Sequence, residues 1–561
     1  MQLVAYGAQD VYLTGNPQIT FWKVVYRRHT NFAVESIEQV FNGSGDFGKK
    51  VVCQIQRNGD LITKMYLRVQ LPELLVGQAW VSKVGHAMLK TVELNIGGTT
   101  IDKHWGDWFN VWYELARKFA HDRGYDQMIG NTDALTIPNS SAGTPPATLW
   151  IPLYFFHCRN DGLALPLIAT QYHDTRIEIE FNPLTSLIVG YTDGTNTANN
   201  GAITSKLSGK NLAACSLFVD YVYLDSEERK KFAQASHEYL IEQLQFTGSE
   251  SVNSPNSKFR LNFNHPCKAL YWNIQQNQYR NGSSFLAYNP KDWYQTAVNA
   301  TKRAALMFLE LDVATGIYST NNVTVNPSTN VNSALCTSFL QALGAARVAY
   351  VDLSSNSVGM GLNPEIANLI VLGPSLTDDL ISIPIEVLVT FFQTSGSPYT
   401  RPGRYTNGDA SELKDVYVQQ YDNYGVFLNG KVNPCEQVLL QLNGQDRFSS
   451  RDGMYFNYVQ PWQCQSNTPA DGINMYSFAL NPEEHQPSGT CNMSRIDNAT
   501  LNINFITTYY VYTDGNANSN QKNQLSNSPL EPSKKSIFNV YATNYNVLRI
   551  MSGMAGLAYS N

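Results

Sequence analysis

Histidines and carboxylates at short spacing are the first residues of this chain that could do chemistry. His104, Asp107 and Glu114 fall in one predicted helix, but positions i, i+3 and i+10 do not converge on one metal ion. His485 follows two glutamates, in a loop bounded by prolines. None of these groups comes with a nucleophile, a base and an orienting residue. The pattern therefore predicts neither a catalytic site nor a metal site.

Other chemistries lack their signatures as well. A glycoside hydrolase needs two facing carboxylates about 5–9.5 Å apart, whereas Glu178 and Glu180 lie on the same face of one predicted strand. No phosphate-binding GxxxxGK[ST] motif occurs, and Gly97-Gly98 lacks the rest of a dinucleotide fingerprint. The net charge of −6 argues against direct nucleic-acid binding. We expect no cofactor and no enzymatic activity.

Composition favours a protein that packs against other proteins. The 561 residues are too many for one ordinary domain, and 43% are hydrophobic, enough for a substantial core. Only 15% are charged, against about 25% in typical proteins. The eight cysteines are scattered without a CxxC pair, as buried thiols are. Without a secretory signal or an apolar run of membrane-spanning length, we expect a soluble protein made in the cytosol.

The dominant hydrophobic period is two, which is typical of strands buried on one face. Many β-branched and aromatic residues, separated by Gly, Pro and Asn turns, indicate an all-β sandwich fold. The predicted strands are Val51–Gln56, Met65–Leu71, Thr91–Ile96, Ile177–Phe181, Leu217–Leu224, Ala269–Gln275, Val438–Leu442, Leu501–Phe505 and Phe538–Leu548.

Two helices are predicted between the strands. The first, His104–Phe119, carries Trp105, Trp108 and Trp112 on one face, a stripe that favours packing between elements over a cofactor pocket. The second follows Asp225, which can cap it, and covers residues 226–245 as a connector between two β units.

An internal repeat supports a division into two similar units. The stretches that begin at Leu94, Ile177 and Ser216 recur in the same order at Leu442, Leu501 and Ser536. Short alternating strings also recur by chance in any β protein, so the pattern alone leaves duplication open. Residues 276–432 form a long insertion with stretches rich in Asn, Ser, Thr, Pro and Gly, which predict exposed loops.

Seven stretches in order along the chain carry a family resemblance. These stretches are Gly7–Thr20, Val25–Phe32, Arg57–Thr63, Ala164–His173, Gln441–Phe448, Gln486–Asp497 and Tyr545–Met554. They resemble the major capsid proteins of nucleocytoplasmic large DNA viruses, in particular those of the chlorovirus and phycodnavirus type. No family motif falls within 276–432.

The resemblance implies a double jelly roll, two tandem eight-stranded jelly-roll sandwiches with short helices and long loop insertions. We assign residues 1–28 to an N-terminal arm on the inner side, 29–225 to the first roll, 226–245 to the connecting helix and 246–561 to the second roll. The insertion 276–432 would then form part of an outer crown.

The implied function is that of a late structural protein of the virion. Homotrimers would form pseudo-hexagonal capsomers of the icosahedral shell of a double-stranded DNA virus. Their partners would be neighbouring capsomers, minor capsid and penton proteins and, indirectly, an internal membrane, with assembly in the host cytoplasm.

Surface glycans could be attached to this protein or bound by it. Some members of the family carry glycans, and of seven N-x-[ST] sequons Asn281 and Asn322 would lie on the crown. Two rival functions remain from the sequence: a minor capsid paralogue, and a lectin-like attachment protein whose loops bind host surface glycans. A β-sandwich glycoside hydrolase is the weakest alternative.

Overall fold

The computed structural model describes most of the predicted sandwiches and only pieces of the long loops. Described are residues 28–190 and 210–275 (without 76–77, 82, 119, 137–142 and 253), 433–512 (without 507), 520–524 and 536–559, with the pieces 7–17, 21, 286–287, 350–352, 357–359, 420–421 and 424–425. Asn281, Asn322 and most of the insertion 276–432 lie outside the described residues.

The first roll is a sandwich of two antiparallel sheets, because its strands alternate buried and exposed side chains. One sheet has the order β1 (Phe32–Val40), β11 (Ala214–Leu224), β3 (Leu61–Leu71) and β7 (Ala147–Pro152), and β8 (Leu165–Pro166) also pairs with β3. The other has the order β2 (Lys50–Gln54), β9 (Thr175–Phe181), β5 (Leu89–Ile96) and β6 (Thr99–Trp105).

The second roll repeats this plan. Its larger sheet has the order β12 (His237–Phe246), β28 (Ile537–Met551), β15 (Pro266–Gln275) and β23 (Asn474–Ser477), with β13 (Glu250–Ser251), β24 (Cys491–Asn492) and β29 (Met554–Leu557) at its margins. The facing sheet has the order β14 (Asn256–Arg260), β25 (Ala499–Phe505), β20 (Cys435–Leu442) and β21 (Gln445–Asp446), with β22 (Arg451–Asp452) on β20.

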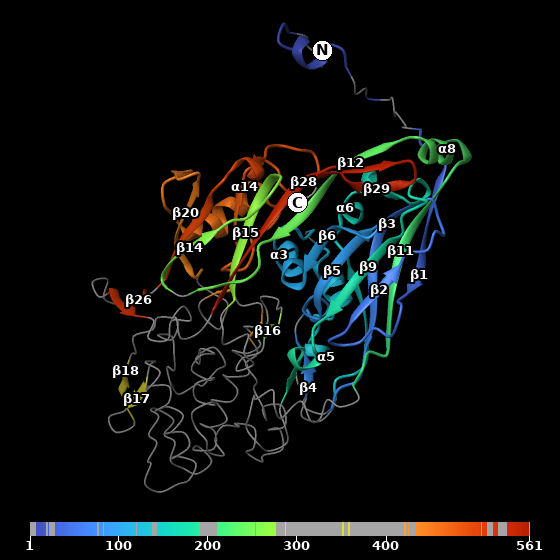
Figure 1. Ribbon diagram of the computed structural model, residues 1–561. Helices are drawn as coiled ribbons and strands as arrows, with labels where there is room; N and C mark the ends of the chain where they lie inside the picture. The colour runs from blue at the N-terminus through green and yellow to red at the C-terminus, as the bar shows by residue number, and fades with distance from the viewer. Residues whose placement is uncertain are drawn as a thin grey trace, which may run out of the picture.

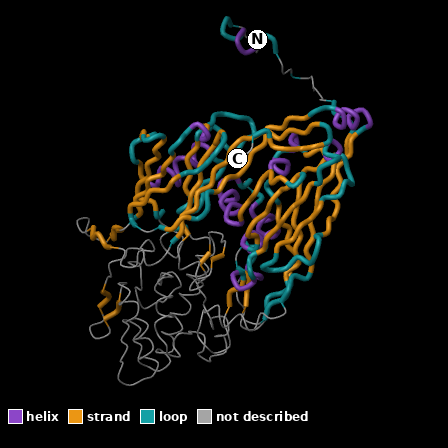
Figure 2. Tube along the Cα trace, viewed as in Figure 1, coloured by secondary structure: helices purple, strands orange, loops and turns teal. Residues whose placement is uncertain are grey.

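The topology confirms the double jelly roll and the internal repeat. Each roll has two four-strand paths, and the repeated stretches occupy equivalent strands: β9 and β25, β5 and β20, β11 and β28. Eight of the nine predicted strands lie entirely within observed ones, and the ninth, Val51–Gln56, extends two residues beyond the end of β2 at Gln54. Figure 2 shows that strands dominate the described body and that helices are short. Among the described residues no helix is long and apolar enough to cross a bilayer.

Short helices and strand pairs fill the connections. The α-helices are α1 (Val11–Thr14), α2 (Val84–Ala87), α3 (Gly106–Ala116), α4 (Asp122–Ile129), α5 (Asp133–Thr136), α6 (Phe156–Arg159), α8 (Ser226–Gln234) and α14 (Gln460–Cys464), the last preceded by a π-helical turn, η8 (Tyr455–Val459). The 3₁₀ turns within the described residues are η1 (Asp161–Leu163), η2 (Leu167–Ala169), η3 (Leu184–Ser186) and η9 (Met493–Arg495). Small pairs are β4 (Gln78–Trp80) with β10 (Ile188–Gly190), β16 (Leu286–Ala287) with β19 (Gln420–Tyr421), β17 (Tyr350–Asp352) with β18 (Ser357–Gly359) and β26 (Thr508–Tyr512) with β27 (Asn520–Gln524).

The predicted connecting helix 226–245 is wrong in its second half. The helix α8 begins after Asp225, whose carboxylate accepts the Ser226 N–H at 2.8 Å, and ends at Gln234. Residues 237–246 form β12, which pairs with β28 through ten consecutive residues. The apolar residues of this stretch fit a helical stripe as well as a strand buried on both faces. The stretch forms a strand because β28 provides hydrogen-bond partners for its backbone.

The strands β12 and β28 extend across both rolls. Ile241 of β12 and Leu548 and Ile550 of β28 are buried in the core of the first roll. Val540 and Ala542, earlier in β28, are buried in the core of the second roll. Figure 1 shows both strands running from the second roll along the end of the first. The two sandwiches therefore share a pair of strands rather than meeting only at a flexible linker.

Both rolls use the same tight turn at equivalent places. Gly97 and Gly98 join β5 to β6, and Asn443 and Gly444 join β20 to β21, all with positive φ. Two consecutive left-handed residues make the type I′ turn, whose twist matches that of antiparallel strands. At Gly97 a Cβ atom would also lie 2.4 Å from Nδ1 of His173, whereas at Gly98 it would meet nothing within 4 Å.

We predict that G97A destabilises the protein more than G98A does. Both substitutions place an alanine at positive φ, which costs roughly 1–2 kcal/mol. Gly97→Ala also forces the His173 ring aside, which adds about 1 kcal/mol or more. Free energies of unfolding from urea titration measure both. Equal losses for the two variants would contradict the close approach of His173.

Candidate functional site at the junction of the rolls

The helix α3 of the first roll inserts its aromatic side chains into the second roll. Trp108 packs against Tyr271 of β15 and Tyr541 of β28, with ring centroids 5.2 and 5.6 Å apart. Trp112 lies in the same buried cluster. The helix covers Gly106–Ala116 rather than the predicted His104–Phe119, because β6 continues to Trp105. The tryptophan stripe thus packs between elements, as predicted.

Asp107, in the first turn of α3, is a polar hub of this junction. One carboxylate oxygen accepts Asn273 Nδ2 at 2.8 Å and Tyr541 OH at 3.1 Å, and the other accepts Gln275 Nε2 at 3.3 Å and the hydroxyl of Tyr424. Burial raises the pKa of Asp107 above its ordinary value, against the lowering effect of these four donors. One side chain of the first roll thereby holds β15, β28 and the end of the insertion.

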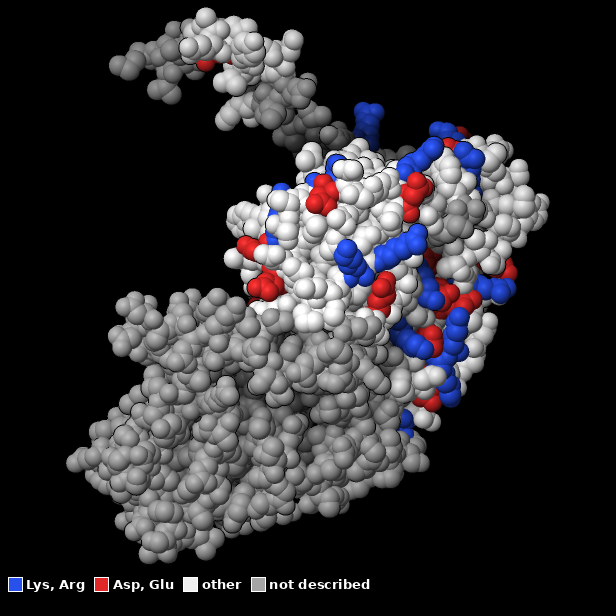
Figure 3. All heavy atoms as spheres, turned by 60° about the vertical axis from the view of Figure 1, so that its left-hand side comes forward, with Lys and Arg blue, Asp and Glu red and all other residues white. Residues whose placement is uncertain are grey.

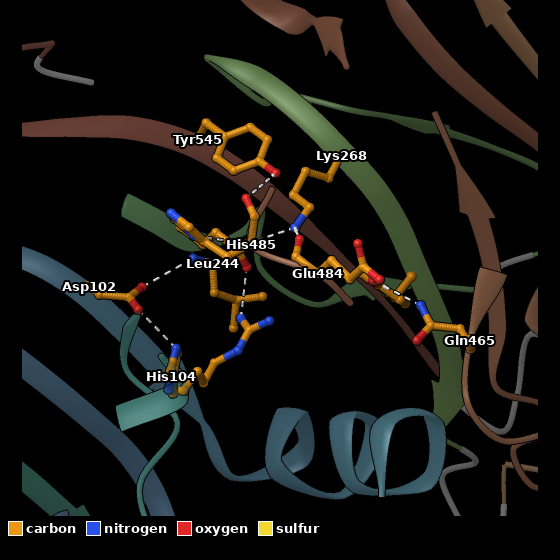
Figure 4. Close-up of polar contacts among 11 residues, drawn as sticks. Asp102, His104, Leu244, Lys268, Gln465, Glu484, His485 and Tyr545 are labelled. Atoms are coloured by element: carbon orange, nitrogen blue, oxygen red, sulfur yellow. Dashed lines mark hydrogen bonds and ion pairs between the residues drawn. The ribbon is translucent and has the colours of Figure 1, made fainter. Parts of the chain in front are cut away.

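A second hub is the buried carboxylate of Glu242 on β12, in the part of the junction where Figure 4 shows Lys268 and His485. Lys268 Nζ of β15 lies 2.7 Å from it, Arg159 of α6 2.9 Å and Nδ1 of His485 3.6 Å. Burial alone would raise the pKa of Glu242, but Arg159, His485 and Lys268 together lower it to about 2. Burial lowers the pKa of Lys268. The charges that meet here come from both rolls and from the strand that joins them.

The surroundings of Glu242 extend this junction in two directions. Lys268 also donates to the carbonyl of Glu484 at 2.8 Å, and Tyr545 OH donates to the carbonyl of His485 at 3.1 Å. On the other side, Asp102 of β6 accepts the backbone N–H of Leu244 at 3.1 Å and lies 3.0 Å from Nε2 of His104. A cleft of about 730 Å³ runs alongside.

The three residues predicted not to share a metal do not come together. His104 contacts Asp102, Asp107 holds the second roll, and Glu114 forms a buried pair with Lys83 at 2.9 Å. Among the described residues no group of three His, Cys, Asp or Glu could hold a metal ion. Glu114 and Asp107 each contact a different partner, Lys83 and the second roll respectively.

Glu178 and Glu180 have lysine partners on neighbouring strands. Lys50 lies 2.7 Å from Glu178, and Lys90 lies 2.6 Å from Glu180, both across antiparallel pairs. These contacts are partly exposed and form a cross-strand ladder on the outer face of the sheet. Figure 3 shows such interleaved charges over part of one face, while most of the described surface there carries neither sign.

Several contacts of the junction had no local signal in the sequence. Nδ1 of His173 lies 2.9 Å from the carbonyl oxygen of Ala555, 382 residues further along the chain. His485 contacts Glu242 rather than the glutamates beside it. Lys83 is buried at positive φ, where its Nζ donates to Asn110 and Glu114. Only the tryptophan stripe pointed toward this junction.

Comparisons with known proteins agree along the whole chain. The family described as large eukaryotic DNA virus major capsid protein matches residues 228–556, and the major capsid protein N-terminus matches residues 20–225. Capsid protein 1 of Acanthamoeba polyphaga mimivirus is 40% identical, and the major capsid protein of Phaeocystis pouchetii virus 41%, each over 100% of this chain and 99% of the relative. A PBCV-1 virus capsid structure superposes with a TM-score of 0.59 at 31% identity, covering 97% of this chain and 100% of that one.

We predict that D107N lowers the free energy of unfolding by about 1–3 kcal/mol, because an amide in place of one carboxylate oxygen leaves buried donors unpaired. Denaturant titration measures the loss. Asp174→Asn, at a half-exposed carboxylate that lies 3.7 Å from Arg176, should change stability by less than about 1 kcal/mol. A D107N variant as stable as D174N would contradict the role of the hub.

We predict a pH-dependent loss of stability for E242Q. The pKa of Glu242 is about 2 in the folded protein and 4.5 ordinarily, so its carboxylate stabilises the fold above pH 4.5 and ceases to do so as the pH falls toward 2. At pH 7, Glu242→Gln should cost about 3–5 kcal/mol, because it leaves buried cations unpaired. The cost should shrink progressively between pH 4.5 and 2.

The matched control is E238Q on the same strand, since Glu238 contacts Arg549 at 2.8 Å with both side chains more than half exposed. It should cost less than about 1 kcal/mol at every pH. Unfolding free energies at several pH values compare the three proteins. A cost of E242Q that stays constant from pH 7 to 3 would show that ionisation of Glu242 is not the cause.

Proposed function

The chain belongs to the major capsid protein family of large eukaryotic DNA viruses, and from that premise we propose that it forms homotrimeric, pseudo-hexagonal capsomers. Its role is structural: it is a capsid protein whose fold is the double jelly roll of viral shells. Capsid proteins of this kind self-associate into shells. The homotrimer, the icosahedral arrangement and the double-stranded DNA genome are parts of the proposal.

The observation that best supports the trimer is the equivalence of the two rolls. Each chain contributes two sandwiches with the same strand order, held as one body by β12 and β28. Three copies around a threefold axis then present six similar sandwiches, which approximates a hexagon. A closed ring of heterologous contacts is an ordinary solution for one chain that must tile a surface.

The same proposal covers the partners and the remaining segments. Residues 1–28 act as an arm on the inner side, toward minor capsid and penton proteins and an underlying membrane. Residues 276–432 belong to the outer crown, where Asn281 and Asn322 are candidate glycan acceptors and host surface glycans are candidate ligands. The protein is made in the host cytoplasm, resides in the virion and works by assembly rather than by turnover.

An exposed apolar edge supports a contact between copies. The strand β1 ends its sheet, and Phe32, Val34 and Val40 expose 52%, 57% and 75% of their surface. Edge strands with apolar side chains associate readily with other chains. By contrast, the outer face of the facing sheet carries the lysine–glutamate ladder. We assign β1 to an interface between subunits.

The trimer is tested by mass in solution. Light scattering on the purified full chain should give three times the chain mass of 62.7 kDa at micromolar concentration. A protein that stays a monomer across the concentration range would contradict the proposal.

The assignment of β1 is tested by V34E. A charge buried between subunits should shift the oligomer toward the monomer by about tenfold or more in dissociation constant, since an unpaired buried charge costs several kcal/mol. The control is Q54E. Gln54 is exposed on β2, the edge strand of the sheet that carries the lysine–glutamate ladder, so this variant should leave the oligomer unchanged. If V34E and Q54E have the same dissociation constant, β1 is not part of the interface. That result would not contradict the trimer itself.

A further inference from the structure

Two cysteines of the second roll face each other across neighbouring strands. Cys267 of β15 and Cys491 of β24 are direct partners in the antiparallel register. Both are free thiols. Cys267 is fully buried in the core of the second roll, and Cys491 packs against the same core from a partly exposed position.

This placement suits a disulfide. Directly opposed residues of antiparallel strands have Cα atoms about 4.5–5.5 Å apart and point to the same face. A disulfide needs a Cα separation of about 4.4–6.8 Å. The two thiols are also close enough that Cys491 raises the pKa of Cys267, beyond the effect of burial. We propose that Cys267 and Cys491 form a cross-strand disulfide once the protein leaves a reducing compartment.

The reaction can proceed by thiol–disulfide exchange with a small dialkyl disulfide such as oxidised glutathione. The thiolate of Cys491, the more accessible partner, attacks one sulfur of the small disulfide and releases one glutathione thiol. Cys267 then loses its proton and attacks Sγ of Cys491, which releases the second glutathione thiol. The protein gives up two hydrogen atoms, and one glutathione disulfide becomes two thiols. Burial keeps Cys267 protonated, so the second step is slow.

The bond would fix a segment that belongs to the junction of the rolls. Lys268, next to Cys267, contacts both Glu242 and the carbonyl of Glu484. Glu484 lies seven residues before Cys491, the first residue of β24, so residues 484–491 would be tied at both ends. The two cysteines are about 220 residues apart, and a cross-link over so long a loop strongly restricts the unfolded chain.

The biological timing rests on the proposed function. The thiols would be reduced during synthesis in the cytosol and oxidised in released particles, because disulfides persist outside the cell. Bond formation itself is a property of the folded chain. It can therefore be tested whether or not the chain forms trimers.

The test uses purified full-length protein incubated with oxidised glutathione and mapped by peptide mass spectrometry without reduction. A cross-linked pair of peptides that contain Cys267 and Cys491 should appear, two hydrogen atoms lighter than the sum of the free peptides. Thermal unfolding of the oxidised protein should shift upward by about 5 °C or more relative to the reduced protein.

Matched variants separate this bond from general oxidation. C491S should abolish both the linked peptides and the thermal shift, while C464S, at another partly exposed thiol, should retain both. Three outcomes would overturn the proposal. Cys267 and Cys491 could remain free thiols, Cys491 could stay in a mixed disulfide with glutathione, or either cysteine could form a disulfide with another cysteine. Mapping on released particles from infected cells then checks the compartment, and reduced thiols there would overturn the timing.

Discussion

The backbone pairing of β12 with β28 is the constraint on which the rest of the structure depends. Their ten paired residues place Ile241 and Leu548 in one core and Ala542 in the other. A shared pair of strands cannot bend freely between the sandwiches, since both faces of it are packed. The relative position of the rolls is therefore set by hydrogen bonds and burial rather than by the length of a linker.

Buried polar groups further restrict the relative position of the two rolls. Asp107 and Glu242 each sit where elements of both rolls meet, and each has partners for its oxygens. Such groups contribute little net stability when they are satisfied but cost several kcal/mol when a partner is lost. They therefore penalise any displacement of one roll against the other. For a subunit that must repeat many times in a shell, a fixed angle matters more than additional stability.

The sequence allowed the strands, the repeat and the tryptophan stripe to be predicted, because each depends on neighbours within a few residues. Alternation identifies β9 and β25, and turn-forming pairs such as Asn443-Gly444 mark strand ends. The stretch 237–246 could not be assigned in this way, since its apolar residues fit both periods and its partner strand lies about 300 residues away. The hubs were hidden for the same reason: Asp107 and Tyr424 are 317 residues apart.

One oxygen of Asp107 accepts hydrogen bonds from Gln275 and from Tyr424, which flank residues 276–423. The chain thus leaves the second roll and returns to it at a single fixed point. The closure entropy of a segment with pinned ends grows only slowly with its length. If this segment lies on the outer crown as proposed, its length and sequence can therefore vary between viruses, which changes what the particle presents to its surroundings without altering the lattice beneath.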